Sequence, residues 1–244
     1  MILNYRQQDN GMYVLSRNDI EHIATDLLRE QFPTNLDYPI PLNTEALFES
    51  LGLRVLHKFL GIPGHEILGA TVMGESEEIV SCDTLMKPIV IEETYGTVLI
   101  NTELSCTKQA ARRRYTEVHE CSHWLLHLSY YDRLPQDGKS RLVACRSVES
   151  YKHERRTDAD WREWQADTLA AALLMPRDVF YDYARSAIKD AGATRGYLIE
   201  GQSRDRSIFH DAVMPISRKF FVSQRAAQIR MIHLGLIKTA SKYF

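Results

Sequence analysis

The chain has 244 residues, of which 44% are hydrophobic and 25% are charged, as in an ordinary globular protein. Its formal net charge of −2 argues against a protein that binds nucleic acid over its whole surface. No apolar run approaches the roughly 18 residues of a membrane span, the first residues lack a secretion-signal pattern, and the four cysteines form no C-x-x-C pair. We therefore expect a cytoplasmic protein with reduced thiols.

The first hundred or so residues predict two helices followed by a sheet. Ser16 and Asp19 form a capping box ahead of an apolar stripe with helical spacing, so a helix is expected over 16–30. A shorter helix over 43–51 is expected to end at Gly52. Beyond it the apolar period changes to two, which predicts strands at 53–59, 69–73, 78–82, 88–92 and 97–101. A small, mostly antiparallel sheet with helices on one side belongs to the α+β class.

The central motif is His119-Glu120-Cys121-Ser122-His123, inside a segment of helical period. Helical residues four apart lie on one face about 6 Å apart along the axis, so His119 and His123 can direct ring nitrogens at one metal ion. Glu120 lies about 100° around the helix, within reach of a water on that ion but poorly placed as a ligand. H-E-x-x-H on a helix is typical of zinc peptidases, in which the Glu is the general base. The alternative is a buried helix whose histidines only satisfy hydrogen bonds.

A catalytic zinc usually has three protein ligands and one position for water, so a third ligand must come from elsewhere. The best candidate is Glu163, in a segment that continues as an alanine-rich helix. Asp167, one turn later, is suited to accept the free N–H of a ligand histidine and hold its tautomer. The fallback ligands are Asp160, Asp167 and His153. The alternative is that Glu163 and Asp167 form the solvated face of this helix.

His127 is excluded as a third ligand because it lies about 12 Å beyond His119 on the same helix. Three-histidine metalloproteases also use a glycine to turn the chain, and none stands between His123 and His127. We expect His127 to lie at the end of the helix, where a positive charge would suit the helix dipole. The segment 128–157 that follows has no clear period, and we expect a long loop that covers or gates the site.

The strand directly before this helix is a candidate for substrate binding. An exposed edge strand beside a metal site can bind an extended peptide by adding it as a further strand. By proximity in sequence alone, the candidate residues are Thr97, Val98, Leu99, Ile100 and Asn101. The alternative is that they form an internal strand of the core, and the sequence does not separate the two.

The C-terminal part of the chain is basic and helical. Pro176 is well placed to open a helix that reaches about Lys189, and a glycine-containing break at 192–202 suggests two domains, 1–195 and 196–244. From residue 201 onward the sequence has eight Lys or Arg residues and only two acidic residues, which gives a local formal charge of +6. Segments 216–222 and 223–234 predict two short helices of helix-turn-helix type, with Ser223 capping the second. Such a unit could bind DNA or a protein partner.

Two motifs together resemble the ImmA/IrrE family of metallopeptidases. The first is Arg113-Arg114-Tyr115-Thr116 with His119-Glu120-Cys121-Ser122-His123-Trp124-Leu125-Leu126-His127, and the second is Glu163-Trp164-Gln165-Ala166-Asp167 with Ala170-Ala171-Ala172-Leu173-Leu174-Met175-Pro176. The strand ending Leu99-Ile100-Asn101 and the tail over 222–236 are also similar, so the resemblance covers about 97–236. Cys121-Ser122 stands where the family usually has Leu-Gly, and Asp167 where Asn is common, and neither departure removes a catalytic group.

The resemblance implies a zincin-like core and a zinc-dependent endopeptidase that cleaves helix-turn-helix repressors in a stress or mobile-element response. Carried over by position, His119, His123 and Glu163 would be metal ligands and Glu120 the general base. The cofactor would be Zn2+, with Mn2+ as the alternative. Within this family the basic tail is expected to recognise the repressor rather than DNA.

Two other functions fit the same residues. One is a regulatory module that has a zincin-like core but does not cleave, and that binds DNA or a repressor through its tail. The intact Glu120 argues against this reading. The other is a metal hydrolase that acts on a substrate other than a peptide.

Overall fold

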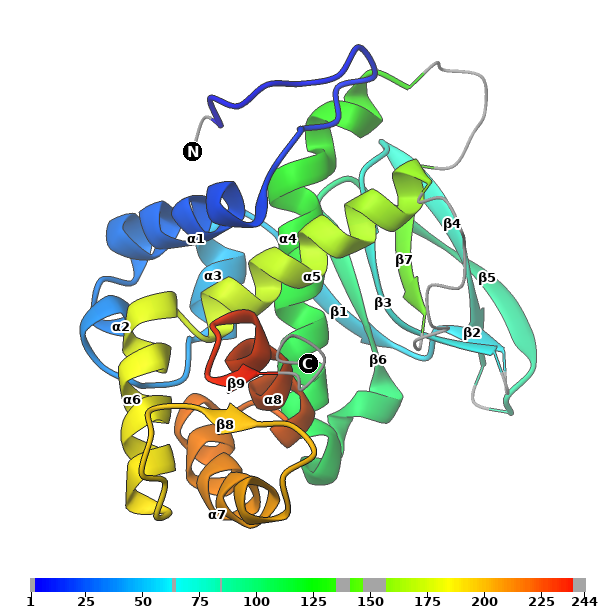
Figure 1. Ribbon diagram of the computed structural model, residues 1–244. Coiled ribbons are helices and arrows are strands. Elements are labelled where there is room, and N and C mark those ends of the chain that lie inside the picture. Colours follow the sequence, from blue (N-terminus) through cyan, green and yellow to red (C-terminus); the bar gives the residue numbers. More distant parts are fainter. Residues whose placement is uncertain (1–2, 63–64, 84, 135–140, 147–156, 239–244) are drawn as a thin grey trace. The chain divides into compact units, whose positions relative to one another are not determined.

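The computed structural model describes residues 3–62, 65–83, 85–134, 141–146 and 157–238 (Figure 1). The chain falls into two compact units, one made of Met1–Ile20 and Asn43–Ala170, the other of Glu21–Leu42 and Ala171–Phe244. The fold belongs to the α+β class, as the sequence predicts. Within the described ranges, no helix has the length and apolar character that a membrane crossing requires.

The main sheet of the first unit has the strand order β1-β6-β3-β2, with β7 paired to β3. Its strands are β1 (Arg54–Lys58), β2 (Gly61–Ile62), β3 (His65–Val72), β6 (Thr97–Asn101) and β7 (Leu142–Arg146). β1 and β6 run parallel, whereas β3 is antiparallel to β2, β6 and β7. The sheet is therefore mixed, with mostly antiparallel pairing. The predicted strands β4 (Ser76–Cys82) and β5 (Pro88–Thr94) form a separate hairpin.

β6 is an internal strand, which decides between the two alternatives that the sequence left open and rules out the exposed edge. It pairs with β1 on one side and β3 on the other, and all five of its residues are buried. The physical reason lies in its sequence: the run Val98-Leu99-Ile100 does not alternate with polar residues, as is typical of a strand covered on both faces. Because both backbone edges are occupied, residues 97–101 cannot accept a further strand.

The segment 128–157 is more regular than predicted. The helix α4 (Ala110–Asp132) continues past His127, and β7 (Leu142–Arg146) pairs with β3. Among the strands that the structure describes, β7 pairs with β3 alone and lies at the edge of the main sheet. The prediction missed β7 because the local hydrophobic pattern of a short segment does not reveal which strand it pairs with. Residues 135–140 and 147–156, with the fallback ligand His153, lie outside the described residues.

Helices pack around this sheet and carry the motifs. α4 packs against β3 and β6, and the short 3-10 helices η1 (Thr102–Ser105) and η2 (Thr107–Gln109) link β6 to it (Figure 1). α3 (Thr44–Ser50) contacts α4 and β1, and its first turn is capped by Asn43. α5 (Asp158–Leu174) carries the second motif.

The capping box predicted for the first helix is present at the start of α1 (Arg17–Gln31). The Ser16 backbone N–H donates to Asp19 Oδ2 at 2.7 Å, and the Asp19 backbone N–H donates to Ser16 Oγ at 3.2 Å. These two bonds satisfy donors that the first helical turn would otherwise leave unpaired, so the helix begins where the sequence predicts.

The second unit is mostly helical. It contains α2 (Thr34–Asp37), α6 (Arg177–Asp190), α7 (Ser203–Phe220) and α8 (Gln224–His233), with a short parallel pair of β8 (Leu198–Ile199) and β9 (Ile237–Lys238). α6 lies where Pro176 predicts it. α7, however, begins well before the predicted residue 216 and includes Pro215. Its buried residues keep helical spacing on both sides of that proline, which holds the helix continuous: Ile208, Ala212, Val213, Ile216 and Phe220.

The turn between α7 and α8 is tight. Phe221 ends α7 in the left-handed conformation, with φ of 53°, and Ser223 caps α8 by accepting the Ala226 N–H at 3.0 Å, as predicted. Arg230 of α8 is 1% exposed and forms a bidentate ion pair with Glu21, whose Oε2 lies 2.8 Å from Nη2. Its Nε also donates to the Met175 carbonyl at 3.0 Å. Arg230 therefore belongs to the core and not to a basic surface of the tail.

Candidate metal centre

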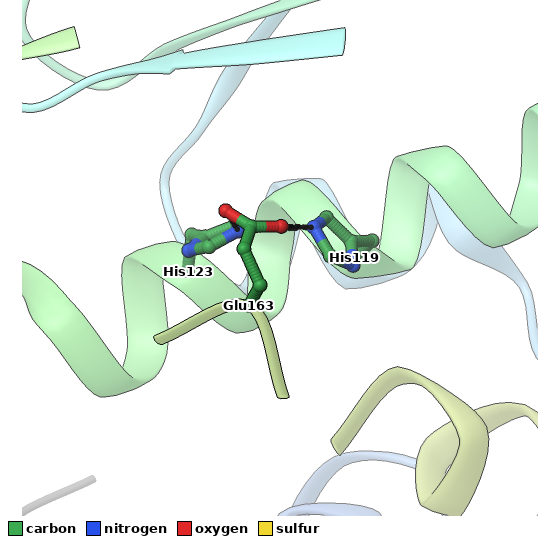
Figure 2. Close-up of side chains that lie close together, drawn as sticks. All are labelled: His119, His123 and Glu163. Atoms are coloured by element: carbon green, nitrogen blue, oxygen red, sulfur yellow. Dashed lines mark hydrogen bonds and ion pairs between the residues drawn. The ribbon is translucent and has the colours of Figure 1, made fainter. Parts of the chain in front are cut away.

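Three side chains from two helices converge in the first unit (Figure 2). His119 and His123 lie one turn apart on α4, with their Nε2 atoms 2.9 Å apart. Glu163 reaches them from α5, with Oε2 3.3 Å from His119 Nε2 and Oε1 3.4 Å from His123 Nε2. One ligand atom from each residue lies within 4.8 Å of the others, so the three could hold a single metal ion.

The charge states of this group suit metal ligation. Burial opposes ionisation of Glu163, but the adjacent imidazoles of His119 and His123 outweigh it and hold the pKa of this carboxyl well below its ordinary value. Burial also lowers the pKa of His123, against the opposing effect of Glu163. A metal needs an ionised carboxylate and a neutral imidazole, and the pKa shifts of Glu163 and His123 both favour those states. Two imidazole nitrogens and one carboxylate also form a known donor set of catalytic zinc.

Asp167 lies beside the first of the two histidines. Its Oδ1 is 3.0 Å from His119 Nδ1, on the side of the ring opposite Nε2. The Tyr115 hydroxyl donates to the Asp167 carbonyl at 3.1 Å and lies 3.4 Å from Oδ1. A carboxylate behind a ligand histidine fixes the orientation of the ring, and the position of Asp167 beside Nδ1 suits it to that task.

His127 lies behind the second histidine, and α4 does not end there, contrary to the prediction. Its Nδ1 is 3.0 Å from His123 Nδ1, and its Nε2 is 3.1 Å from Gln165 Oε1. Gln165 in turn donates from Nε2 to the Tyr13 carbonyl at 2.8 Å. Burial lowers the pKa of His127 well below its ordinary value. Among the residues that the structure describes, the group that could hold a metal ion consists of His119, His123 and Glu163, and His127 contacts it through His123.

Glu120 of α4 is fully buried, and its carboxylate faces Gly69 and Thr71 of β3. Its Oε2 accepts a hydrogen bond from the Thr71 hydroxyl at 2.6 Å, whereas Oε1 has no hydrogen-bond partner within the described part of the chain. Burial raises the pKa of Glu120 to about 7. A buried carboxylate with one unsatisfied oxygen and a pKa near neutrality has the properties of a general base.

Gly69 of β3 is a site residue that the motif search did not find. A Cβ at this position would lie 2.8 Å from Thr116 Cγ2 and 2.9 Å from Glu120 Oε1. The strand therefore passes α4 at a distance that only glycine permits, and Gly69 and Thr71 together bound the space of the Glu120 carboxylate. The one sequence signal was a glycine inside a predicted strand, which often marks a close backbone approach.

Two other candidate residues, Asp160 and Asn101, form hydrogen bonds with partners outside the group of His119, His123 and Glu163. Asp160 caps the start of α5, where its Oδ2 accepts the Thr157 N–H at 2.7 Å. Asn101, at the end of β6, donates from Nδ2 to the Leu60 and Ile67 carbonyls at 3.2 and 2.7 Å. Both side chains thus have structural partners of their own.

No protein-family model matches the sequence, and a search of curated proteins finds no similar chain. The support for a metal centre therefore comes from the molecule itself. It consists of the H-E-x-x-H sequence on one helix and the carboxylate that a second helix brings to it.

Proposed function

We propose that this protein is a zinc-dependent endopeptidase of the ImmA/IrrE type. The observation that carries the proposal is the convergence of Glu163 with His119 and His123, next to the buried Glu120. H-E-x-x-H completed by a distant Glu is the arrangement of zinc peptidases such as thermolysin. The resemblance of the two motifs to the ImmA/IrrE family supports the finer assignment.

Each residue near the centre has a distinct task in this proposal. A Zn2+ ion held by His119, His123 and Glu163, or Mn2+ as the alternative, would polarise the scissile carbonyl and lower the pKa of a water molecule. Glu120 accepts the proton of the attacking water and returns it to the leaving amine, which contributes roughly 100- to 10,000-fold to the rate. Because Thr71 occupies Oε2, the unpartnered Oε1 is the oxygen that exchanges the proton.

An extended peptide is the substrate that the sheet supports. β7 replaces β6 as the edge to which a peptide strand could add. β7 pairs with the part of β3 that adjoins Glu120, since Cα partners are Gly69 with Cys145 and Thr71 with Val143. The main sheet therefore presents an edge one strand away from the residues that surround the general base.

The proposed protein substrate is a helix-turn-helix transcriptional repressor, cleaved in a stress or mobile-element response. This assignment depends on the family resemblance. The helices α7 and α8 would recognise the repressor, with DNA as the less favoured partner. Burial of Arg230 supports that preference, because it removes one of the positive charges with which α8 could contact phosphates.

The test is cleavage of a helix-turn-helix repressor encoded beside this protein in the same genome. The purified chain, loaded with Zn2+, is incubated with the repressor, and the products are measured by mass spectrometry. We expect one cut by the native chain and at least a 100-fold slower cut by Glu120→Gln, with Zn2+ still bound. The exposed Glu103→Gln is the matched control and should cleave like the native chain.

Two outcomes would contradict the proposal. Cleavage by Glu120→Gln at the native rate would remove Glu120 from the reaction. If Glu120→Gln releases the repressor from its operator as well as the native chain does, without a cut, the protein is a regulatory binding module with a zincin-like core.

A further inference from the structure

We propose that His127 is a positioning residue, which selects the tautomer of His123 through a hydrogen-bond chain that begins at the backbone of Tyr13. The inference rests on the proposed metal centre and names a residue that supports it. The chain runs from the Tyr13 carbonyl through Gln165 and His127 to His123, with three successive separations of 2.8, 3.1 and 3.0 Å.

The direction of this chain is set at its far end. A backbone carbonyl can only accept a hydrogen bond, so the Gln165 atom that faces Tyr13 must be the amide nitrogen. The other end of the same amide, Oε1, then faces His127 Nε2 at 3.1 Å. Because Oε1 can only accept, His127 Nε2 must carry a proton.

The same logic carries through the two rings. A neutral imidazole has one N–H and one lone pair, so a proton on His127 Nε2 leaves a lone pair on Nδ1. That lone pair accepts the proton of His123 Nδ1, which lies 3.0 Å away. His123 Nε2 then presents its lone pair towards Glu163, as a metal ligand must. The reverse direction would place a proton on His123 Nε2 and prevent ligation.

The side chains of this hydrogen-bond chain are buried, so water cannot take the place of any of them. His123 and His127 are fully buried and Gln165 is 3% exposed. If the acceptor at residue 127 were lost, His123 Nδ1–H would be left buried and unpaired, and the ring could turn or change tautomer. His119 is different, because its Nδ1 faces the carboxylate of Asp167, a side chain that is 45% exposed. The two histidines of the motif are thus held by two unlike partners.

The experiment measures Zn2+ affinity, by competition with a chelator, for variants of the full chain. His127→Leu removes the acceptor, and we expect its affinity to fall about 10- to 100-fold, as for Asp167→Ala behind His119. His127→Asn places an amide oxygen near the position of Nδ1, and it should recover most of that loss. His22→Leu, a matched change at an exposed histidine, should bind like the native chain. Native affinity in His127→Leu would overturn the proposal.

A second measurement on the native chain decides the case even if His127→Leu does not fold. Long-range 15N–1H NMR spectra of the imidazoles report which ring nitrogen carries the proton. We expect the Nε2–H form of His127 with and without Zn2+, and the Nδ1–H form of His123 when Zn2+ is bound. A proton on His127 Nδ1 would overturn the proposal.

The outcomes separate this inference from the proposed function. A native chain that binds Zn2+ but cleaves no peptide would overturn the peptidase assignment and leave the role of His127 standing. A native chain that binds no Zn2+ would overturn both.

Discussion

Gly69 of β3 stands so close to Glu120 of α4 that a methyl group at residue 69 would fall 2.9 Å from the unpartnered Oε1 of the carboxylate. This contact joins the sheet to the residue that we propose as the general base. It indicates that the position of the base is set by β3 as well as by its own helix. None of His119, His123 and Glu163 is among the nearest neighbours of that methyl position.

Gly69→Ala is therefore expected to impair catalysis without removing the metal. The added methyl group overlaps Thr116 and Glu120, and overpacking of this kind costs about 1–3 kcal/mol of unfolding free energy. We expect slower peptide cleavage with native Zn2+ affinity, measured on the same preparation. Gly196→Ala is the control, because its Cβ would meet only the end of the exposed Arg185 side chain. Native cleavage by Gly69→Ala would show that β3 moves freely relative to α4.

Thr71→Val should shift the pH dependence of cleavage. Burial raises the pKa of Glu120 to about 7, and the hydrogen bond from Thr71 acts in the opposite direction by favouring the ionised form. Only the ionised carboxylate can accept a proton, so activity is lost as the pH falls through this pKa. Without the hydroxyl the pKa rises further, and the acid limb of the kcat/KM profile should move up by about one pH unit.

Thr71→Ser keeps a hydroxyl and is the matched control for this experiment. Its acid limb should lie close to that of the native chain. If the profiles of Thr71→Val and the native chain coincide, the Thr71 hydrogen bond does not influence the group that limits activity at low pH.

The buried pair of Arg230 and Glu21 predicts a strong dependence of stability on both partners. Arg230→Met alone leaves an uncompensated buried carboxylate, and such a loss typically costs about 3–5 kcal/mol of unfolding free energy. The double variant with Glu21→Leu should recover most of this cost. Chemical denaturation of Arg230→Met, of Glu21→Leu and of the double variant gives the coupling free energy between the two residues. The exposed Arg225→Met on the same helix should change stability by no more than about 0.5 kcal/mol.

If the stability loss of the double variant equals the sum of the losses of the two single variants, the assignment of Arg230 to the core is contradicted. The result also bears on the tail as a recognition surface. Arg230 counts towards the charge of +6 in the sequence, yet its side chain binds Glu21 of α1 and the Met175 carbonyl. It therefore does not belong to a surface that could contact another protein or DNA.

Features with a local signal were predicted well from the sequence. The capping box of Ser16 and Asp19, the cap at Ser223 and the helix after Pro176 lie where the patterns indicate. The spacing of His119 and His123 also predicts their shared direction, because a helix places residues four apart on one face. These signals depend on residues within one or two helical turns of each other, so the local amino-acid sequence is enough to predict them.

Features that depend on distant partners were left open, were not predicted or were wrong. For residues 97–101 the sequence left an exposed edge and an internal strand open, and β6 lies between β1 and β3. β7 lay in a segment that was expected to be a loop. α7 was expected to begin after Pro215, yet packing of its apolar stripe carries the helix through that residue. In each case the deciding energy comes from pairing or burial against residues far away in the sequence.

The sequence by itself determined which chemical groups this helix presents together, because H-E-x-x-H on a helix encodes two imidazoles on one face and a carboxylate beside them. Only the tertiary structure decided that Glu163 completes the group, that Gly69 and Thr71 bound Glu120, and that His127 lies behind His123. The physical reason is that a helical period is a property of neighbouring residues. The convergence of side chains from α4, α5 and β3 exists only once burial and strand pairing have brought those elements together.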